Sequence, residues 1–371
     1  MRKYFILFLI IKCYLLPVSL YASNELDGYE IRGKLEGLFE GEKVTLVLNE
    51  SVPYNKIIFD SSTVKNGEFY FKGHIPEGPR LFYMRFSRRK CFLVLIIDNG
   101  EILFIKSDMN LNKLTHGENI RRRVSIIGNP SGDSFLKLEG LIGVIIQGNE
   151  WTRAFLKRTK DSLGYDKKSF GSVLETKSLY NQIVAKYLMN NTNVSKVVPL
   201  FIDNVYFYIG HEAFLSEIYN SLPAEAQCGY YGRLLNYRLP LCVGRKAPVF
   251  SFTSQQGKTI SLDSLIPQSN IIIINFWKDN IEGQQFNKYL TAIYNKYHIN
   301  GLNIISVFTG SEAVRESPPG IGILDSTVAR EIIKLYHIQL PTTVLINKKG
   351  EILAWDTSED ELEYYIDSNL K

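Results

Sequence analysis

The feature that most constrains the fold is an apolar segment in the last third of the chain, Ile271-Ile272-Ile273-Ile274-Asn275-Phe276-Trp277. A short run that is apolar at nearly every position predicts a strand that is buried on both faces, as in the centre of an α/β sheet. The polar stretch Lys278–Gln285 follows, and a helical pattern comes after it. The segment therefore predicts an α/β unit in which a central strand leads directly into a helix.

The chain has 371 residues, which is more than one typical domain contains. Changes of pattern predict a signal peptide over residues 1–22, a β-sandwich-like domain over 28–128, a helical segment over 132–241 and the α/β domain over 244–371. The expected fold class is a multidomain α+β protein.

The N-terminus has the order of features that is typical of a secretory signal peptide. Arg2 and Lys3 precede an apolar run that starts at Tyr4, and Ala22 offers a small residue for cleavage. We therefore expect a protein exported to the periplasm or cell envelope. Lys12 interrupts the apolar run, so an uncleaved membrane anchor stays open as the alternative.

Charge gives no reason to expect a nucleic-acid partner. Loss of Arg2, Lys3 and Lys12 with the signal peptide lowers the formal net charge from +5 to +2. After residue 22, no stretch has the ~18 to 20 apolar residues that a membrane-spanning helix needs. We expect no membrane span in the mature protein.

Three cysteines follow the predicted signal peptide: Cys91, Cys228 and Cys242. Cys91 begins an apolar strand pattern and is expected to be a buried small side chain. Cys228 and Cys242 are the only plausible disulfide pair in an oxidising compartment. A disulfide and two independent thiols both remain open.

Residues 28–128 carry short strand patterns that are separated by turn signals, which is typical of a β-sandwich or barrel. Asn66-Gly67 marks one turn, and Asp98-Asn99-Gly100 predicts a hairpin between Phe92–Ile97 and Ile102–Ile105. Tyr29-x-Ile31-x-Gly33 and Gly67-x-Phe69-x-Phe71-x-Gly73 are the clearest motifs. With them the stretch resembles an N-terminal domain of unknown function that precedes thioredoxin-like domains in exported proteins of Gram-negative envelopes.

The helical segment shows apolar residues at helical spacing from Leu179 to Leu188, and Thr176 is expected to cap that helix. Further along, Asp325 is expected to cap a helix that runs through Leu335. The acidic run Glu359-Asp360-Glu361 is expected to lie on a solvated helix surface.

Residues 244–371 resemble the thioredoxin-like branch that includes TlpA-type and AhpC/TSA-type proteins. The landmarks are Gly244-x-x-Ala247-Pro248-x-Phe250, the strand that ends in Phe276-Trp277, the strand Leu302–Phe308, and the run Leu340-Pro341-Thr342-Thr343. The resemblance implies a thioredoxin fold, and it implies that Pro341 is the family's cis-proline; a trans proline at the start of a strand is the alternative.

The same resemblance implies that the redox motif is lost. Alignment on Phe276-Trp277 places Ile281 and Gln284 where the family has its C-x-x-C cysteines, and residues 243–371 contain no cysteine. Without a thiolate, neither disulfide exchange nor peroxidase chemistry can take place there. The remnant groove, which we define by Trp277, Ile281, Gln284, Leu340 and Pro341, is instead the expected binding surface. The connection after Val307 also looks shorter than in the family.

These observations favour a redox-inactive, thioredoxin-fold protein of the cell envelope that binds a peptide or protein partner and is not an enzyme. The alternative is a TlpA-like thiol-disulfide oxidoreductase in cell redox homeostasis that uses Cys228 and Cys242. A third hypothesis places the main function in the β-domain, which would bind a glycan or a surface partner. The five histidines lack metal-ligand spacing, so neither a metal nor another cofactor is expected.

Overall fold

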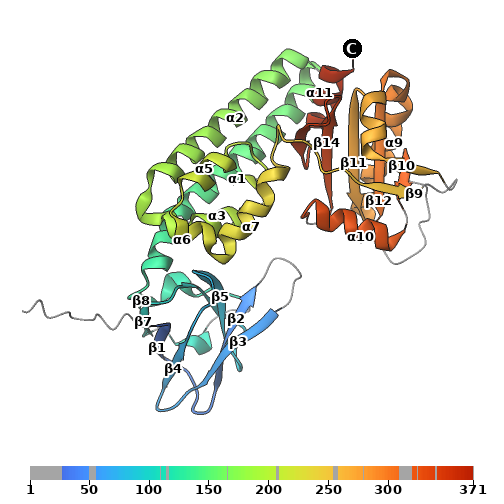
Figure 1. Ribbon diagram of the computed structural model, residues 1–371. Helices are drawn as coiled ribbons and strands as arrows, with labels where there is room; N and C mark the ends of the chain where they lie inside the picture. Colours follow the sequence, from blue (N-terminus) through green and yellow to red (C-terminus); the bar gives the residue numbers. More distant parts are fainter. Residues whose placement is uncertain are drawn as a thin grey trace, which may run out of the picture.

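The computed structural model describes residues 27–49, 56–108, 110–113, 117–164, 166–205, 209–253, 258–278, 280–308, 320–323, 325–338 and 341–370. The protein is a mixed α/β structure with several sheets and many helices (Figure 1). The predicted signal peptide, Leu340 and most of the connection after Val307 lie outside the described residues. Among the described residues, no helix is both long enough and apolar enough to cross a membrane.

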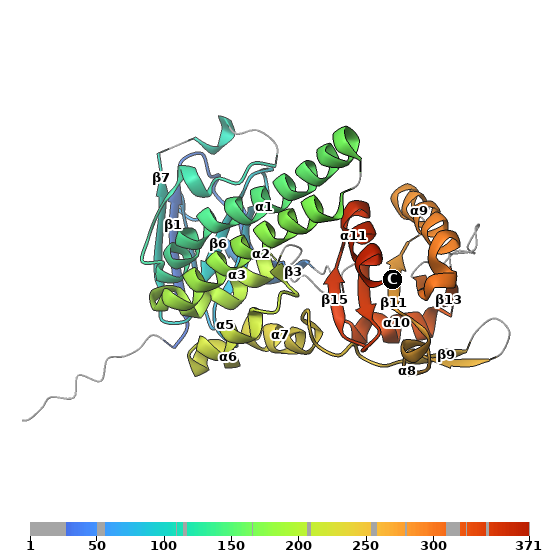
Figure 2. The ribbon, with the colours of Figure 1, turned by 90° about the horizontal axis from the view of Figure 1, so that it is seen from above.

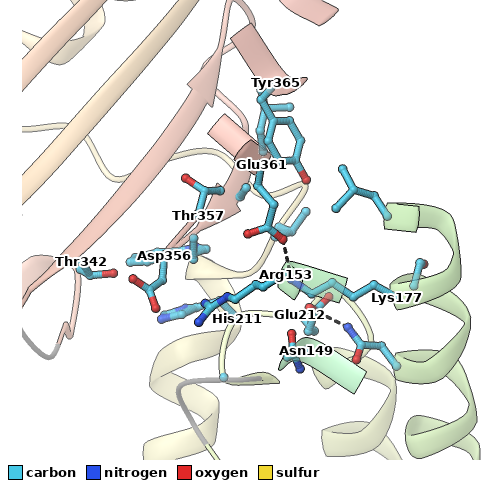
Figure 3. A pocket seen from close by; sticks show the side chains of 18 of the residues that line it. Asn149, Arg153, Lys177, His211, Glu212, Thr342, Asp356, Thr357, Glu361 and Tyr365 are labelled. Carbon is cyan, nitrogen blue, oxygen red and sulfur yellow. Dashed lines mark hydrogen bonds and ion pairs between the residues drawn. The ribbon is translucent and has the colours of Figure 1, made fainter. Parts of the chain in front are cut away.

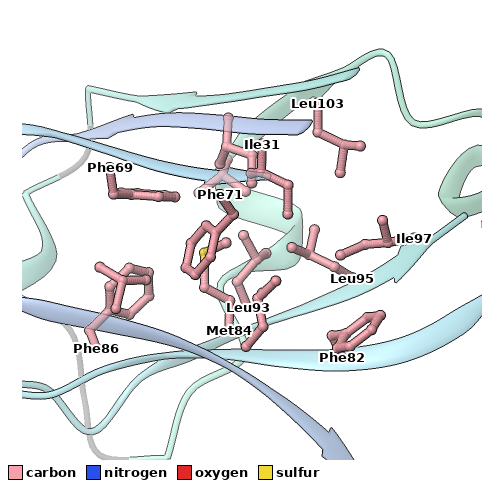
Figure 4. Packing of buried hydrophobic residues seen from close by; sticks show 14 of the residues in the cluster. Ile31, Phe69, Phe71, Phe82, Met84, Phe86, Leu93, Leu95, Ile97 and Leu103 are labelled. Atoms are coloured by element: carbon pink, nitrogen blue, oxygen red, sulfur yellow. The ribbon is translucent and has the colours of Figure 1, made fainter. Parts of the chain in front are cut away.

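Two four-stranded sheets make up the N-terminal part, in the orders β4-β1-β7-β8 and β3-β2-β5-β6. The strands are β1 (Tyr29–Leu35), β2 (Lys43–Asn49), β3 (Lys56–Thr63), β4 (Glu68–Gly73), β5 (Arg80–Phe86), β6 (Phe92–Ile97), β7 (Ile102–Ser107) and β8 (Ser125–Ile127). Their alternate side chains form one shared core, in which Phe69 and Phe71 of the first sheet face Phe82 and Met84 of the second (Figure 4).

The predicted hairpin between Phe92–Ile97 and Ile102–Ile105 is wrong. Strand β6 pairs with β5, whereas β7 pairs with β1 and β8, so the turn at Asp98–Gly100 carries the chain from one sheet to the other. A turn signal shows that the chain reverses, but it does not show which strands then pair. At the Asn66-Gly67 turn both residues have positive φ, as that dipeptide favours.

A helical segment follows, and it lies between the N-terminal sheets and the C-terminal sheet (Figures 1 and 2). Its elements are α1 (Pro130–Leu163), α2 (Lys167–Asn190), α3 (Val198–Asn204), α5 (Leu215–Ser221), α6 (Ala224–Cys228) and α7 (Tyr230–Arg238), with short 3-10 turns at Thr192–Val197 and Leu239–Leu241. Asp166 caps α2 by accepting a hydrogen bond from the Ser169 backbone N–H. Thr176, which was predicted to be a cap, lies inside α2, and its hydroxyl donates to the Ser172 carbonyl.

The C-terminal part is a five-stranded mixed sheet in the order β13-β12-β11-β14-β15, with helices on both faces. Its elements are β11 (Ile271–Trp277), α9 (Ile281–Tyr297), β12 (Leu302–Phe308), β13 (Ile321–Ile323), α10 (Ser326–Leu335), β14 (Thr342–Asn347), β15 (Ile352–Trp355) and α11 (Glu359–Asn369), preceded by the hairpin of β9 (Ser251–Thr253) and β10 (Thr259–Ser261) and by α8 (Leu262–Leu265).

The prediction for the central strand is confirmed. All seven residues of β11 are buried, and they alternate between two cores: Ile272 and Ile274 pack with the α10 side, and Ile271 and Ile273 with the α9 side. Asp325 caps α10 as predicted, because its side chain accepts from two backbone N–H groups.

Candidate functional site

The junction between β11 and α9 holds Ile281 and Gln284, the two positions that the sequence resemblance aligns with a pair of cysteines. Asn280 caps α9, and its side-chain oxygen accepts a hydrogen bond of 2.8 Å from the Gly283 N–H. Ile281 is the first helical residue and is 75% exposed, and Gln284 is half-buried one turn later. Gly283 is sterically required, because a Cβ there would lie 2.3 Å from the Lys278 carbonyl oxygen. The helix start is well formed, but it presents an aliphatic side chain and not a thiol.

A cavity of about 380 Å³ lies behind this junction, and we call it the Trp277 cavity. Trp277, Phe286 and Pro341 supply its apolar walls. Thr343 and Thr357 also line it; both are more than nine-tenths buried, and neither side-chain hydroxyl has a hydrogen-bond partner among the described residues. A buried hydroxyl without a partner costs about 1–3 kcal/mol.

The mouth of the Trp277 cavity is charged. Arg153 comes from α1 of the helical segment, while Asp356 and Glu359 follow β15. Arg153 makes no hydrogen bond or ion pair with the described part of the chain. Burial raises the pKa of Asp356, and the nearby positive charge of Arg153 opposes that rise. The helical segment therefore contributes a side chain to a site that otherwise belongs to the C-terminal sheet.

A second hollow of about 250 Å³ lies between the helical segment and the C-terminal sheet (Figure 3), and we call it the interdomain pocket. It shares several residues with the Trp277 cavity, including Arg153, Pro341 and Asp356, so the two are adjacent. Its other polar lining residues include Asn149, Lys177, Asn181, His211, Glu212 and Glu361.

Glu361 is the most enclosed carboxylate of this pocket. It is 4% exposed, and its Oε1 lies 3.0 Å from the Lys177 Nζ, as Figure 3 shows. Burial alone would raise the pKa of Glu361, but the charge of Lys177 and hydrogen bonds from Ser358 and Lys177 hold it below its usual value. Glu361 is therefore ionised, and it ties α11 to α2. The prediction of a solvated surface for Glu359–Glu361 is wrong at this position.

The pKa values of two neighbouring side chains, Glu212 and His211, are shifted from their ordinary values. Burial raises the pKa of Glu212, whose Oε1 accepts a hydrogen bond from the Asn181 amide. Burial and the charge of Arg238 lower the pKa of His211 to about 3, and its ring stacks on Trp355 with 3.7 Å between centroids. His211 is thus neutral at physiological pH and acts as a flat packing group.

The structure separates the residues that were predicted to form the remnant groove. Trp277 and Pro341 line the Trp277 cavity; Ile281 and Gln284 lie at the head of α9 and do not line it. Leu340 lies outside the described residues, so the geometry of the Leu340–Pro341 bond stays a prediction. Sequence reasoning missed Arg153, Thr343, Thr357 and Asp356 as site residues. The pattern Ser358-x-x-Glu361, a capping box, was the one signal at this end of the site.

The three cysteines among the described residues, Cys91, Cys228 and Cys242, are free thiols. Cys228 is exposed at the end of α6, while Cys242 is 1% exposed in the helical core. Burial raises the pKa of Cys242 to about 12, so its thiol stays protonated. Of the two states that the sequence left open, the structure contains the independent thiols. Among the described residues, no three His, Cys, Asp or Glu side chains converge in a way that could hold a metal ion.

Comparisons with known proteins each cover about a third of the chain or less. Residues 29–135 match the family model described as a domain of unknown function, DUF4369. No curated protein matches the chain.

Solved structures match about a third of the chain. The thioredoxin domain of a thiol-disulfide oxidoreductase from Bacteroides vulgatus is 19% identical, with 35% of this chain and 99% of that domain covered and a TM-score of 0.31. A thiol:disulfide interchange protein from a Bacteroides species is 19% identical over 35% of this chain and 90% of its own, with a TM-score of 0.31. A thiol-disulfide oxidoreductase from Bacteroides fragilis is 22% identical over 33% of this chain and 98% of its own, with a TM-score of 0.28. These three structures are described as a thioredoxin domain, a thiol:disulfide interchange protein and a thiol-disulfide oxidoreductase.

Proposed function

We propose that this protein is an exported, redox-inactive member of the thioredoxin-like group whose C-terminal domain binds an extended peptide segment of a partner in the cell envelope. The observation that carries the proposal is the Trp277 cavity: it lies beside Pro341, and the buried hydroxyls of Thr343 and Thr357 in it have no hydrogen-bond partner in the part of the chain that the structure describes. The layout of a β-sandwich, a helical segment and a thioredoxin fold belongs to the same proposal.

The chemistry of the cavity indicates what it would hold. An extended peptide that lies along the backbone near Pro341 points alternate side chains to one side. One of these would enter between Trp277 and Phe286 and reach the hydroxyls of Thr343 and Thr357. A side chain with an apolar stem and an uncharged hydrogen-bonding end, such as glutamine, fits those groups best. Arg153 and Asp356 at the mouth would then meet the peptide backbone or its neighbouring side chains.

The thiols argue against the alternative function of disulfide exchange. Cys242 is buried and its raised pKa keeps it protonated, and only a thiolate attacks a disulfide. Cys228 alone cannot complete a dithiol cycle. The wild-type protein is therefore expected not to reduce insulin, and a redox titration with alkylation should find no pair that cycles near roughly −200 mV.

The test of binding is selection of random heptapeptides displayed on phage against the purified protein, followed by calorimetric titration of an enriched peptide. Thr343→Val keeps the shape of the cavity and removes one hydroxyl, so the peptide's Kd should rise roughly tenfold, equivalent to about 1.4 kcal/mol. Thr291→Val is the matched control, because that hydroxyl is exposed on the outer side of α9. Failure to enrich any peptide, or an equal Kd for Thr343→Val and wild type, would contradict the proposal.

A further inference from the structure

The outward face of the sheet β4-β1-β7-β8 carries a continuous row of large side chains in the N-terminal domain. The strand register aligns Tyr70 of β4, Arg32 of β1, Phe104 of β7 and Ile127 of β8. Tyr70 and Phe104 are each 46% exposed, and Ile127 is 57% exposed. With neighbouring strands about 4.8 Å apart, the row is about 14 Å long.

Arg32 lies between the two aromatic rings, and its contacts with both hold them in place. Its guanidinium carbon is 5.8 Å from the centroid of Tyr70 and 5.9 Å from that of Phe104. Contacts of this kind are worth about 0.5–1 kcal/mol at exposed sites. The rings are thus held as a fixed pair with a cation between them.

Rows that carry most of the charge of this face run along both sides of the aromatic row. Lys72, Glu30 and the exposed Ile102 flank it on one side; Glu68, Lys34 and Lys106 flank it on the other. Together with Arg32, the face carries four cations against two carboxylates. Both carboxylates are already used in ion pairs, Glu30 with Arg32 and Lys72 and Glu68 with Lys34. Lys106 makes no ion pair with the described part of the chain, so the face has positive charge to offer an acidic ligand.

On the outward face of the other sheet, the apolar side chains are covered by the helical segment of the same chain. Leu81 of β5 and Ile96 of β6 point away from the sandwich core and pack into the core of the helical segment. The row on the first sheet has no such cover among the described residues. It also borders a hollow of about 850 Å³, whose lining includes Arg32, Lys34, Tyr70, Phe104 and Lys106.

From these observations we propose that the row Tyr70–Arg32–Phe104–Ile127 is a binding site for an acidic polysaccharide chain. Sugar rings stack their C–H faces on exposed aromatic rings, and carboxylate or sulfate groups pair with Arg32 and the flanking lysines. Beyond this row, Ile102 is the one large apolar side chain on the described part of the face, and the other flanking side chains named above are charged. A stable protein interface needs a broader apolar centre in roughly 800 Å² per partner, so a thin polymer fits this face better than a protein does.

Affinity electrophoresis tests the site, with full-length exported protein in native gels that contain polygalacturonate or heparin. The wild type should be retarded by at least one of these polymers and much less by methyl-esterified polygalacturonate, which has the same backbone with most of its charge removed. Retardation should weaken when NaCl rises from about 0.1 M to about 1 M, because the Debye length falls from ~10 Å to ~3 Å.

Variants locate the binding on the sheet. Tyr70→Ala and Phe104→Ala should each raise the Kd roughly tenfold, and Lys106→Gln should reduce the salt dependence. Phe155→Ala on α1 is the matched control, because Phe155 is 43% exposed and distant in sequence from the row. No retardation by either acidic polymer would overturn the proposal, as would equal retardation by the esterified polymer or unchanged binding of the ring variants. A dimer of the wild type that Tyr70→Ala dissociates would also overturn it, since a second copy would then cover the face.

Discussion

The head of α9 and the cavity behind it are two halves of one site, and they differ in what they offer. At the head, Ile281 is exposed, and the helix cap is complete because Asn280 satisfies the Gly283 N–H. In the cavity, Thr343 and Thr357 keep buried hydroxyls for which the described residues supply no hydrogen-bond partner. The head of α9 presents no thiol, while the interior holds two buried hydroxyls without a partner among the described residues. This difference is the basis of the proposal that the site holds a ligand and does not exchange electrons with it.

The largest effect is expected when cysteines are introduced at positions 281 and 284. The double variant Ile281→Cys/Gln284→Cys should gain insulin reduction, on the order of tenfold or more above the wild-type background, because the start of α9 favours a thiolate. Turbidity of reduced insulin measures the gain, and Ile281→Cys alone is the control that cannot form the motif disulfide. If the double variant folds and stays inactive, the head of α9 has lost more than its two thiols.

The ion pair between Lys177 and Glu361 tests how firmly the helical segment is held against the C-terminal sheet. Lys177→Met leaves Glu361 buried without its cation and should lower the free energy of unfolding by about 2 kcal/mol, less than the ~3–5 kcal/mol of a fully buried pair because Lys177 is partly exposed. Denaturant unfolding measures it. Lys196→Met is the control: its pair with Glu225 is exposed on both sides, so the loss should be about 0–1 kcal/mol. Equal losses in the two variants would mean that Glu361 is hydrated in solution.

Replacement of Thr343 tests whether its buried hydroxyl lacks a hydrogen-bond partner. Thr343→Val should raise the free energy of unfolding by about 1 kcal/mol, because it removes a buried hydroxyl without a partner, while it weakens peptide binding. Thr152→Val should do the opposite to stability, because the buried Thr152 hydroxyl donates to the Gly148 carbonyl at 2.8 Å. If Thr343→Val destabilises the protein as much as Thr152→Val does, an ordered water already occupies the cavity.

The smallest expected effect is a pH dependence from Glu212. Its pKa is raised in the folded state, so the native protein binds more protons than the unfolded chain does between the ordinary and the raised value. Stability from this group is therefore present below the ordinary carboxyl pKa and is lost as pH rises through the folded pKa. Glu212→Gln should stabilise the protein at neutral pH relative to wild type, and the gain should vanish in acid. Thermal unfolding at several pH values measures the difference, and a gain that does not depend on pH would contradict it.

Sequence patterns were sufficient for some features whose signal is local. The apolar run of β11 needed only its own composition, and the Asp325 cap needed only the next three residues. Two long-range features could not be predicted this way. Glu361 is buried because Lys177, 184 residues earlier, reaches it across the interface. Helix α1 lies within the predicted helical segment, but its bounds were not predicted, because its partners change along its 34 residues from β6 at one end to α11 at the other, and no single apolar stripe runs its length.

Of the candidate site, only the residues that belong to local sequence motifs could be predicted. Trp277 and Pro341 come from motifs that the resemblance supplies, and the structure places both on the cavity wall. Arg153 belongs to a different part of the chain, and nothing near it in the sequence points to the groove. The unpaired state of the Thr343 hydroxyl depends on the absence of neighbours, which only the folded structure can reveal.

The central claim is that the site binds its partner without thiol chemistry. The most direct measurement is the Kd of an enriched peptide by calorimetry before and after complete alkylation of the thiols in native protein, with mass spectrometry of the peptide complex. The account predicts the same Kd in both states and no covalent adduct. A mixed disulfide between the protein and a cysteine-containing version of the peptide, or binding that alkylation of Cys228 abolishes, would contradict it.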